Sequence, residues 1–282
     1  MRYLLAGLLG VTCFLVHGQE QNTDSTRSLL SRPANAGDSM ALLNQLSAEV
    51  RSTDLNKALT YALTAKALAE RTGNKKVLSM SLLNAGTAHY YQGDHAQAVA
   101  CYLQGLSIAE QIADTLMTIL TLNELGTLEK KNGDVKSSEI HLLRALALSR
   151  VRRDTAMIAH SMNNVGHVYE LQDDLAKAMT YYRASADIRE RIGDLSGAAY
   201  NYDNIGNILA KQGNYDEAKK YFEREIGIFS EINDRNAHAV ALNNMGEMYS
   251  LRKDFRKARE YLFRSLAESR EIGYKDLRRH IY

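Results

Sequence analysis

The sequence predicts an all-α fold of repeated helix pairs. The chain of 282 residues contains a single proline, so almost nothing in it breaks helices. Aspartate recurs at forty-residue intervals, at Asp114, Asp154, Asp194 and Asp234. Sandwiches and barrels of β-strands need many turns rich in glycine and proline, which this composition does not supply. A hydrophobic content of 45% and a charged content of 24% are ordinary globular values, so wholesale disorder is also excluded.

The net charge is +2, from 35 basic and 33 acidic residues. Nucleic-acid binding requires a concentrated basic face, and no run of basic residues provides one, so we expect no nucleic-acid partner. The two cysteines, Cys13 and Cys101, cannot build a disulfide framework.

The first residues are typical of an export signal. Arg2 gives a positive start, Leu4 to Val16 is a mostly apolar run, and Val16-His17-Gly18 supplies a cleavage pattern before Gln19. We therefore expect a signal peptide over 1–18 and a periplasmic or secreted protein. The run is shorter than the roughly 20 apolar residues of a membrane span, but an uncleaved anchor remains the alternative. The polar segment 19–37 is predicted to be a flexible linker.

Four series of residues recur at forty-residue intervals, and they stay aligned with one another over some two hundred residues. Asp or Asn recurs at two positions of each repeat, where its side-chain oxygen can cap a helix N-terminus. Gly93, Gly133 and Gly213 precede such caps and can adopt the left-handed conformation that ends a helix. Each repeat thus divides into a first helix, here called the A helix, and a second, the B helix. For one repeat we expect an A helix near 155–172 and a B helix near 175–192. The predicted repeats lie near 38–74, 75–114, 115–154, 155–194, 195–234 and 235–274.

Glycine recurs in the middle of the A helices, where it costs about 1 kcal/mol relative to alanine. The five positions are Gly86, Gly126, Gly166, Gly206 and Gly246. We expect these glycines to allow close approach of the B helix of the same repeat, with alanines such as Ala178 and Ala218 facing them. Large B-helix residues are expected to fill the space around that contact: Tyr102, Leu142, Tyr182, Phe222 and Leu262.

This pattern resembles the tetratricopeptide repeat family. The resemblance rests on Leu242-Asn243-Asn244-Met245-Gly246-x-x-Tyr249, followed by Asp254-Phe255-x-x-Ala258-x-x-Tyr261, and covers about residues 38–274. It implies a right-handed α-solenoid of about six antiparallel helix pairs. The forty-residue variety is similar to the peptide-binding solenoids of kinesin light chains, and to the exported sensor halves of bacterial histidine kinases and helix-turn-helix regulators.

In this family the A helices line a concave groove, so the resemblance implies that polar A-helix residues bind a peptide or protein segment. An asparagine amide has both donors and an acceptor, which suits an extended backbone. The alternative is that these amides bond to the next repeat and fix the stacking. The predicted binding residues are Asn84, Asn123, Glu124, His160, Asn163, Asn164, His167, Tyr200, Asn204, Asn207, Lys211, Asn243, Asn244 and Glu247.

Enzyme chemistry finds little support, because the chain has no glycine-rich phosphate loop, no His-Glu-x-x-His and no Gly-x-Ser-x-Gly. His160 and His167 could share one face, but a metal would need a third ligand. We therefore expect a non-enzymatic scaffold without cofactor or metal. Residues 275–282 read as the start of a further, incomplete helix, so we expect a partner or a missing C-terminal segment to cover the last pair. The alternative function is the periplasmic sensor part of a truncated signal-transduction regulator.

Overall fold

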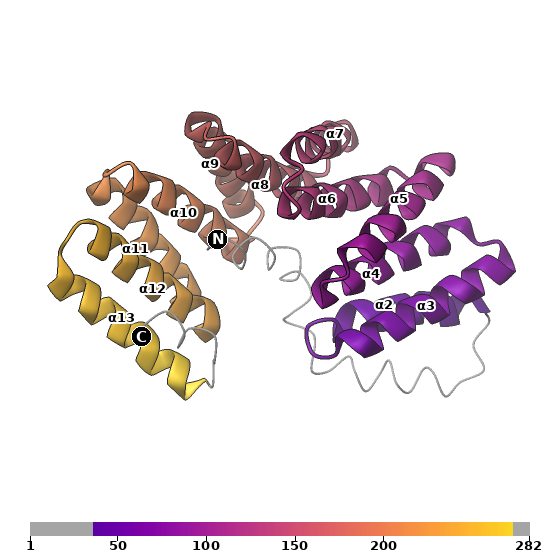
Figure 1. Cartoon of the computed structure of the whole chain (residues 1–282), viewed down its shortest axis with the longest axis horizontal. Helices are drawn as coiled ribbons and strands as arrows, with labels where there is room; N and C mark the ends of the chain where they lie inside the picture. Colours follow the sequence, from indigo (N-terminus) through magenta and orange to yellow (C-terminus); the bar gives the residue numbers. More distant parts are fainter. Residues whose placement is uncertain (1–35, 273–282) are drawn as a thin grey trace. The chain divides into compact units, whose positions relative to one another are not determined.

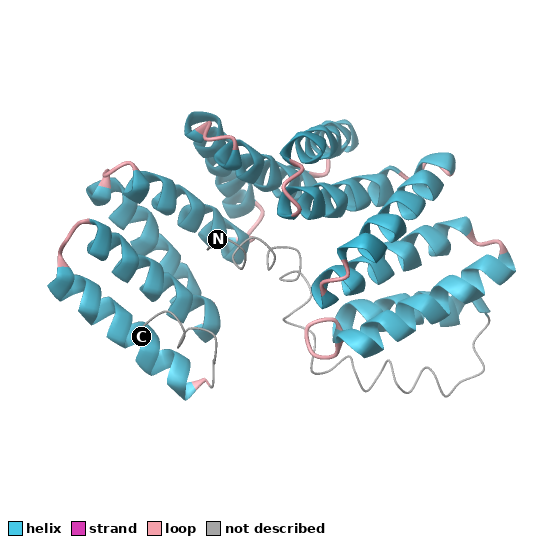
Figure 2. Cartoon of the chain, in the orientation of Figure 1, coloured by secondary structure: helices cyan, strands magenta, loops and turns pink. Residues whose placement is uncertain are grey.

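The computed structural model describes residues 36–272, and every regular element within this range is an α-helix (Figure 2). The predicted signal peptide (1–18), most of the predicted linker (19–37) and the predicted incomplete helix (275–282) lie outside the described residues. None of the helices between residues 36 and 272 has the length and hydropathy that crossing a membrane requires.

The chain forms two compact units, which divide between Asn164 and Val165, within helix α8 (Figure 1). The first unit contains α2 (Ala36–Val50), α3 (Leu55–Thr72), α4 (Lys75–Gln92), α5 (His95–Gln111), α6 (Thr115–Lys131), α7 (Val135–Arg152) and the start of α8 (Thr155–Leu171). The second contains the end of α8, α9 (Leu175–Arg191), α10 (Leu195–Lys211), α11 (Tyr215–Glu231), α12 (Arg235–Leu251) and α13 (Phe255–Glu271). The described residues thus confirm an all-α fold of six antiparallel helix pairs, with the first helix beginning two residues before the predicted boundary.

The predicted aspartate and asparagine caps begin the helices as expected, with one exception. Asp54 Oδ1 accepts from the backbone N of Lys57, and equivalent bonds occur at nine other turns. Asn214 makes no such bond; α11 instead has Asp216 and Glu217 in its first turn, where acidic side chains interact favourably with the helix dipole. A residue with positive φ precedes the cap at every turn from Gly73 to Lys253, so the left-handed backbone recurs every twenty residues.

The mid-helix glycines lie against the B helices, as predicted. The side chains nearest to them are the large ones, and the backbone oxygen of Ala258 would lie 3.3 Å from a Cβ at Gly246. A Cβ at Gly206 would lie 2.8 Å from the Phe222 ring, and one at Gly166 would lie 2.6 Å from the Tyr182 ring. The same large side-chain position faces the other three glycines, through Tyr102, Leu142 and Leu262. The glycines therefore make room for a buried aromatic or leucine side chain.

Within each unit, consecutive helices pack on one another, and A helices of successive repeats also contact each other directly: α2 with α4, α4 with α6 and α10 with α12. Ion pairs link the B helices of successive repeats, such as Arg144 with Glu110 at 2.6 Å and Arg183 with Glu217 at 3.3 Å. Exposed pairs of this kind contribute little, about 0–1 kcal/mol each. The direct contacts make the A-helix side the closely packed face of each unit.

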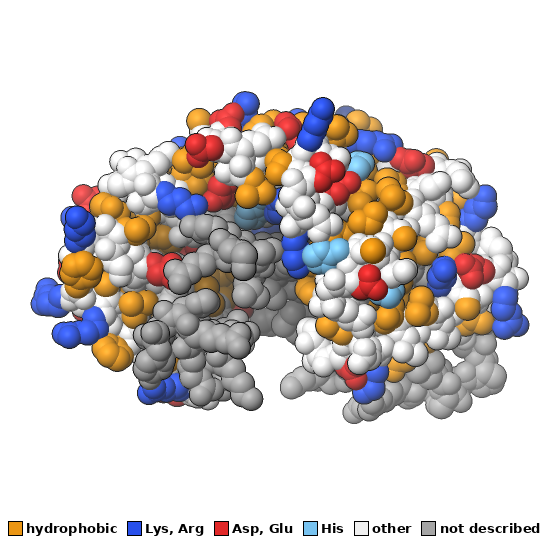
Figure 3. All heavy atoms as spheres, viewed as in Figure 1, with side chains coloured by type: hydrophobic (Ala, Val, Ile, Leu, Met, Phe, Trp, Pro, Cys, Tyr) orange, Lys and Arg blue, Asp and Glu red, His pale blue; other side chains and the backbone are white. Residues whose placement is uncertain are grey.

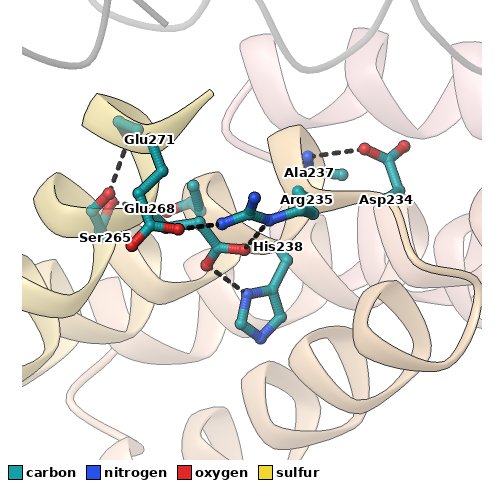
Figure 4. A network of polar contacts seen from close by, with 9 residues as sticks. Asp234, Arg235, Ala237, His238, Ser265, Glu268 and Glu271 are labelled. Atoms are coloured by element: carbon teal, nitrogen blue, oxygen red, sulfur yellow. Dashed lines mark hydrogen bonds and ion pairs between the residues drawn. The ribbon is translucent and has the colours of Figure 1, made fainter. Parts of the chain in front are cut away.

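A polar network joins the start of α12 to the end of α13 (Figure 4). Arg235 lies 3.5 Å from Glu268 and 2.6 Å from Glu271, while His238 Nδ1 lies 2.7 Å from Glu268 Oε2. Beside it, the hydroxyl of Ser265 donates to the carbonyl of Ala239 at 2.7 Å. This network fixes the last helix pair of the second unit.

Candidate functional site

Each A helix lies beside the A helix of the next repeat, and the space between two such helices is here called a gap. Amide hydrogen bonds cross every second gap. Asn84 Nδ2 donates to Asn44 Oδ1 at 3.0 Å, which joins α4 to α2. Asn164 Nδ2 donates to Asn123 Oδ1 at 3.2 Å, which joins α8 to α6. In the second unit, Asn244 Nδ2 donates to Asp203 Oδ1 at 2.8 Å, which joins α12 to α10. Three of the predicted amides thus donate to a side chain of the preceding A helix, and the same contact recurs at intervals of about eighty residues.

Serine hydroxyls extend two of these bridges. Asn123 Nδ2 donates to Ser161 Oγ at 3.1 Å, and Asn44 Nδ2 donates to Ser81 Oγ at 2.9 Å. Asn123 is only 2% exposed and Asn164 only 4%. At these two positions the stacking alternative raised by the sequence describes the contacts, because a side chain so deeply buried presents little surface to a ligand.

The remaining gaps hold a tyrosine hydroxyl beside a carboxylate. Tyr102 comes from α5, passes Gly86, and donates to Thr87 Oγ1 on α4 at 3.2 Å. Tyr182 comes from α9, passes Gly166, and donates to Glu170 Oε2 at 2.9 Å, with His167 Nδ1 at 2.8 Å from the same hydroxyl. Without a glycine in the A helix, neither ring could reach this face.

Each of these tyrosines has a carboxylate and a cation nearby. Burial raises the pKa of Glu124, while the charge of Arg51 and a hydrogen bond with Tyr102 act in the opposite direction. In the second unit, Lys211 Nζ lies 3.1 Å from Glu170 Oε1. Burial, followed by the charge of Glu170, raises the pKa of Tyr182 well above its ordinary value, so its hydroxyl stays protonated and acts as a donor.

The second unit collects most of the remaining predicted residues. Asn207 Nδ2 donates to Asp203 Oδ1 at 2.7 Å, and Asn243 Nδ2 donates to Glu247 Oε1 at 3.0 Å. Asn204, Asn207 and Asn244 are half-buried, and Glu247 is exposed. These side chains form a polar surface on α10 and α12 that is already held in place by its own hydrogen bonds.

Three predicted residues have other surroundings. The ring of Tyr200 packs against Phe229 of α11, with ring centroids 5.3 Å apart, so this residue belongs partly to the hydrophobic core. His160 Nε2 lies 3.2 Å from Asn164 Nδ2, and Asn163 is 7% exposed. Between residues 36 and 272, no three histidine, cysteine or acidic side chains are placed to hold a metal ion.

The predicted binding residues do not include several members of these contacts, namely Asn44, Ser81, Ser161, Glu170, Tyr102 and Tyr182. A signal for the tyrosines was present: the B-helix residue that faces the glycine alternates between tyrosine and a non-hydroxylated side chain, as Tyr102, Leu142, Tyr182 and Phe222. Side chains of both charges are interspersed over the face drawn in Figure 3.

Comparison with known proteins agrees with this geometry. The profile described as tetratricopeptide repeat matches residues 39–111, 117–191 and 195–267. The chain belongs to the tetratricopeptide repeat family. Each matched segment spans two of its forty-residue repeats, and no curated protein matches the chain. Repeat proteins of this kind present extended binding surfaces and are typical of scaffolds for protein interaction.

Solved structures of tetratricopeptide repeat type share the fold at low sequence identity. BtubC from P. vanneervenii is 18% identical, with 79% of this chain and 93% of that chain covered and a TM-score of 0.69. A Rap protein solved with the competence and sporulation factor is 17% identical, with 90% and 76% covered and a TM-score of 0.69. A Rap conjugation gene regulator of the plasmid pLS20, solved with the Phr* peptide, is 16% identical, with 83% and 73% covered and a TM-score of 0.61.

Proposed function

We propose that this tetratricopeptide repeat protein binds an extended protein or peptide segment along the A-helix faces of its units, as a non-enzymatic scaffold. The observation that carries the proposal is the half-buried polar surface of Asn204, Asn207 and Asn244, in which Asn207 and Asn244 are held by hydrogen bonds to Asp203. Interior packing does not require half-exposed amides, and amides fixed in advance lose little side-chain entropy on binding. Two similar structures were solved with a peptide or factor bound, which supports the proposal for this chain.

A selection from displayed random peptides tests this function directly. The full chain is immobilised, bound peptides are sequenced, and the dissociation constants of individual synthetic binders are measured. Replacing His167 and Asn204 with alanine should weaken binding at least tenfold, because both are half-buried on the A-helix face. The control replaces Arg183 and Glu223 with alanine; both are exposed on B helices and should have less than a twofold effect. Peptides that bind both variants equally would reject the A-helix face as the site.

Export of the protein through residues 1–18 is also a proposal, and it rests on the sequence pattern alone. N-terminal sequencing of the protein recovered from its native host tests it. A chain that begins at Gln19 supports export with cleavage, and a retained Met1 in the cell envelope supports the uncleaved anchor instead. A chain that stays in the cytoplasm rejects export. The role as the sensor part of a truncated regulator stays a prediction that rests on the family resemblance.

A further inference from the structure

The second unit places four carboxyl groups from four helices close enough to influence one another. Burial, together with the charges of Glu170 and Glu247, raises the pKa of Asp203, and the charge of Asp203 contributes to raising the pKa of Glu225. Lys211 supplies a positive charge to Glu170, at 3.1 Å. Within residues 36–272, Asp203, Glu225 and Glu247 have no ion pair with a lysine or arginine. These carboxyl groups therefore lie in a region where positive charge is scarce.

The asparagines around these carboxylates are oriented by them. Asn207 and Asn244 donate from Nδ2 to Asp203, and Asn243 donates from Nδ2 to Glu247. Because a carboxylate only accepts hydrogen bonds, the nitrogen of each amide must point toward it. The carbonyl oxygens of the three amides therefore point away from the carboxylates, and the surface offers a ligand mainly acceptors.

The surroundings of Glu225 indicate, separately from the amide orientations, that this region lacks positive charge. It is 2% exposed, and its Oε2 has no hydrogen-bond partner. Asp203 is the charged group that acts on it. The equivalent positions of neighbouring B helices are small, with Gly105, Ala145, Ser185 and Ser265. A buried carboxyl group at a position that otherwise takes a small side chain costs stability unless a partner compensates for it.

We propose that the ligand of the second unit carries a cationic side chain, a lysine or arginine, that binds between Glu247 and the carbonyl oxygens of Asn207 and Asn244, with Asp203 behind them. This inference rests on the proposed function and specifies the chemistry of the bound segment. Glu247 is exposed and the two amides are half-buried, so an ammonium or guanidinium group can reach all three. Guanidinium and ammonium groups carry only donors, which complements a surface of acceptors.

The protonation of Asp203 adds a second signature. Burial raises its pKa to about 7, so a cation nearby would favour its ionised form and binding would release protons. The charged and titratable groups around it are Glu170 from α8, Tyr182 from α9, Lys211 from α10, Glu225 from α11 and Glu247 from α12. Affinity for a cationic peptide should therefore rise between pH 6 and pH 8.

The test uses the displayed-peptide selection on the full chain. Lysine and arginine should be enriched among the bound peptides relative to the input library. Replacing the cationic residue of an individual synthetic binder with glutamine should weaken its binding at least tenfold. A protein with Asp203→Asn and Glu247→Gln should lose the preference, and Glu247→Gln alone should reduce it, since that side chain is exposed and its loss leaves the core intact.

The matched control removes two exposed carboxylates from B helices, with Glu223→Gln and Glu260→Gln. It changes the net charge equally, so a preference lost in both proteins would mean non-specific attraction and would overturn the inference. Bound peptides that depend on His167 and Asn204 but show no excess of lysine or arginine would also overturn it, while the proposed function would stand. A selection that yields no bound peptides, or only ones indifferent to every A-helix substitution, would reject both.

Discussion

Gly197 lies against the guanidinium of Arg189, and a Cβ at this glycine would overlap both Arg189 Nη1 and the Asp194 carboxylate. Arg189 is 3% exposed, and its Nε lies 3.7 Å from Asp194 Oδ2. The two positions are eight residues apart, and their sizes compensate each other along the chain. In two repeats the first position is small and the second is large, with Ala109 and Met117, and Ser149 and Met157. In the next two the order is reversed, with Arg189 and Gly197, and Phe229 and Ala237.

This compensation predicts a strong coupling between the two positions. Gly197→Met should lower the free energy of unfolding by several kcal/mol, because the new side chain displaces a buried cation from its carboxylate. Adding Arg189→Ser recreates the pair found at Ser149 and Met157 and should recover much of the loss. A double-mutant cycle, measured by urea unfolding and circular dichroism, should give an interaction energy of about 1–3 kcal/mol. Additive effects would mean that the two sites do not share one space.

The glycines of α10 and α11 should respond oppositely to the same substitution. Gly206→Ala should lower the free energy of unfolding by about 1–3 kcal/mol, because its Cβ would lie 2.8 Å from the buried ring of Phe222. Gly227→Ala should raise it by about 1 kcal/mol, because Gly227 is helical with no atom near the new Cβ. Urea unfolding of the two variants measures both. A gain at Gly206 would show that Phe222 can move aside freely.

The turn between α5 and α6 should be stabilised by a glycine. Ala113 has φ of 54°, a left-handed conformation that an L-residue with a Cβ adopts at some cost. Ala113→Gly should therefore raise the free energy of unfolding by about 0.5–1 kcal/mol. Ala147→Gly is the control: this residue is exposed within α7, where glycine should cost about 1 kcal/mol. Equal losses in the two variants would contradict the expected relief at Ala113.

The buried carboxyl groups of Asp203 and Glu225 should make the protein less stable as the pH rises. Asp203 has a pKa of about 7 and burial raises that of Glu225 well above its ordinary value, so the folded chain holds protons that the unfolded chain releases near pH 4. Their contribution is present at low pH and declines as the pH rises from about 4 to about 7 for Asp203, and from about 4 upward for Glu225. The free energy of unfolding should therefore fall between pH 5 and pH 8.

Glu225→Ser isolates the part of this effect that belongs to Glu225. Serine occupies the equivalent position at Ser185 and Ser265, and removing the unpaired carboxyl group should raise the free energy of unfolding at pH 8 by about 1 kcal/mol or more. The gain should be smaller at pH 5, where the carboxyl group is neutral. Glu223→Ser on the exposed side of the same helix provides the control and should change stability little at either pH. A gain independent of pH would show that the titration of Glu225 does not matter.

The helix pairs were predictable from sequence because their signals are local and repeated. A capping aspartate acts on its own first turn, so Asp54 and Asp174 could be assigned without knowledge of the fold. Asn214 shows the limit of that reasoning: the residue type fits a cap, yet the bond is absent. The mid-helix glycine indicated a close approach, and large residues predicted around it, such as Tyr182 and Phe222, are the side chains that face it.

The candidate site was only partly predictable, for a related reason. The register placed Asn123 and Asn164 on neighbouring A helices, yet whether an amide bonds to its neighbour or faces solvent depends on burial, and these two are buried. Asn207 and Asn244 remain half-buried because the acceptor between them is the carboxylate of Asp203. The role of Asp203 follows from charges on other helices, which no local pattern contains.

The alternation of amide bridges and tyrosine hydroxyls along the A helices has a consequence for rearranging the gene. Removing forty residues would place a surface from an amide gap against a surface from a tyrosine gap, and polar groups would then lie beside partners they do not have in the present order. Removing eighty residues would instead join each surface to its natural successor. Shortened or lengthened versions of this chain should therefore tolerate changes in steps of two repeats better than in steps of one, and the two-repeat segment is the natural module for engineering it.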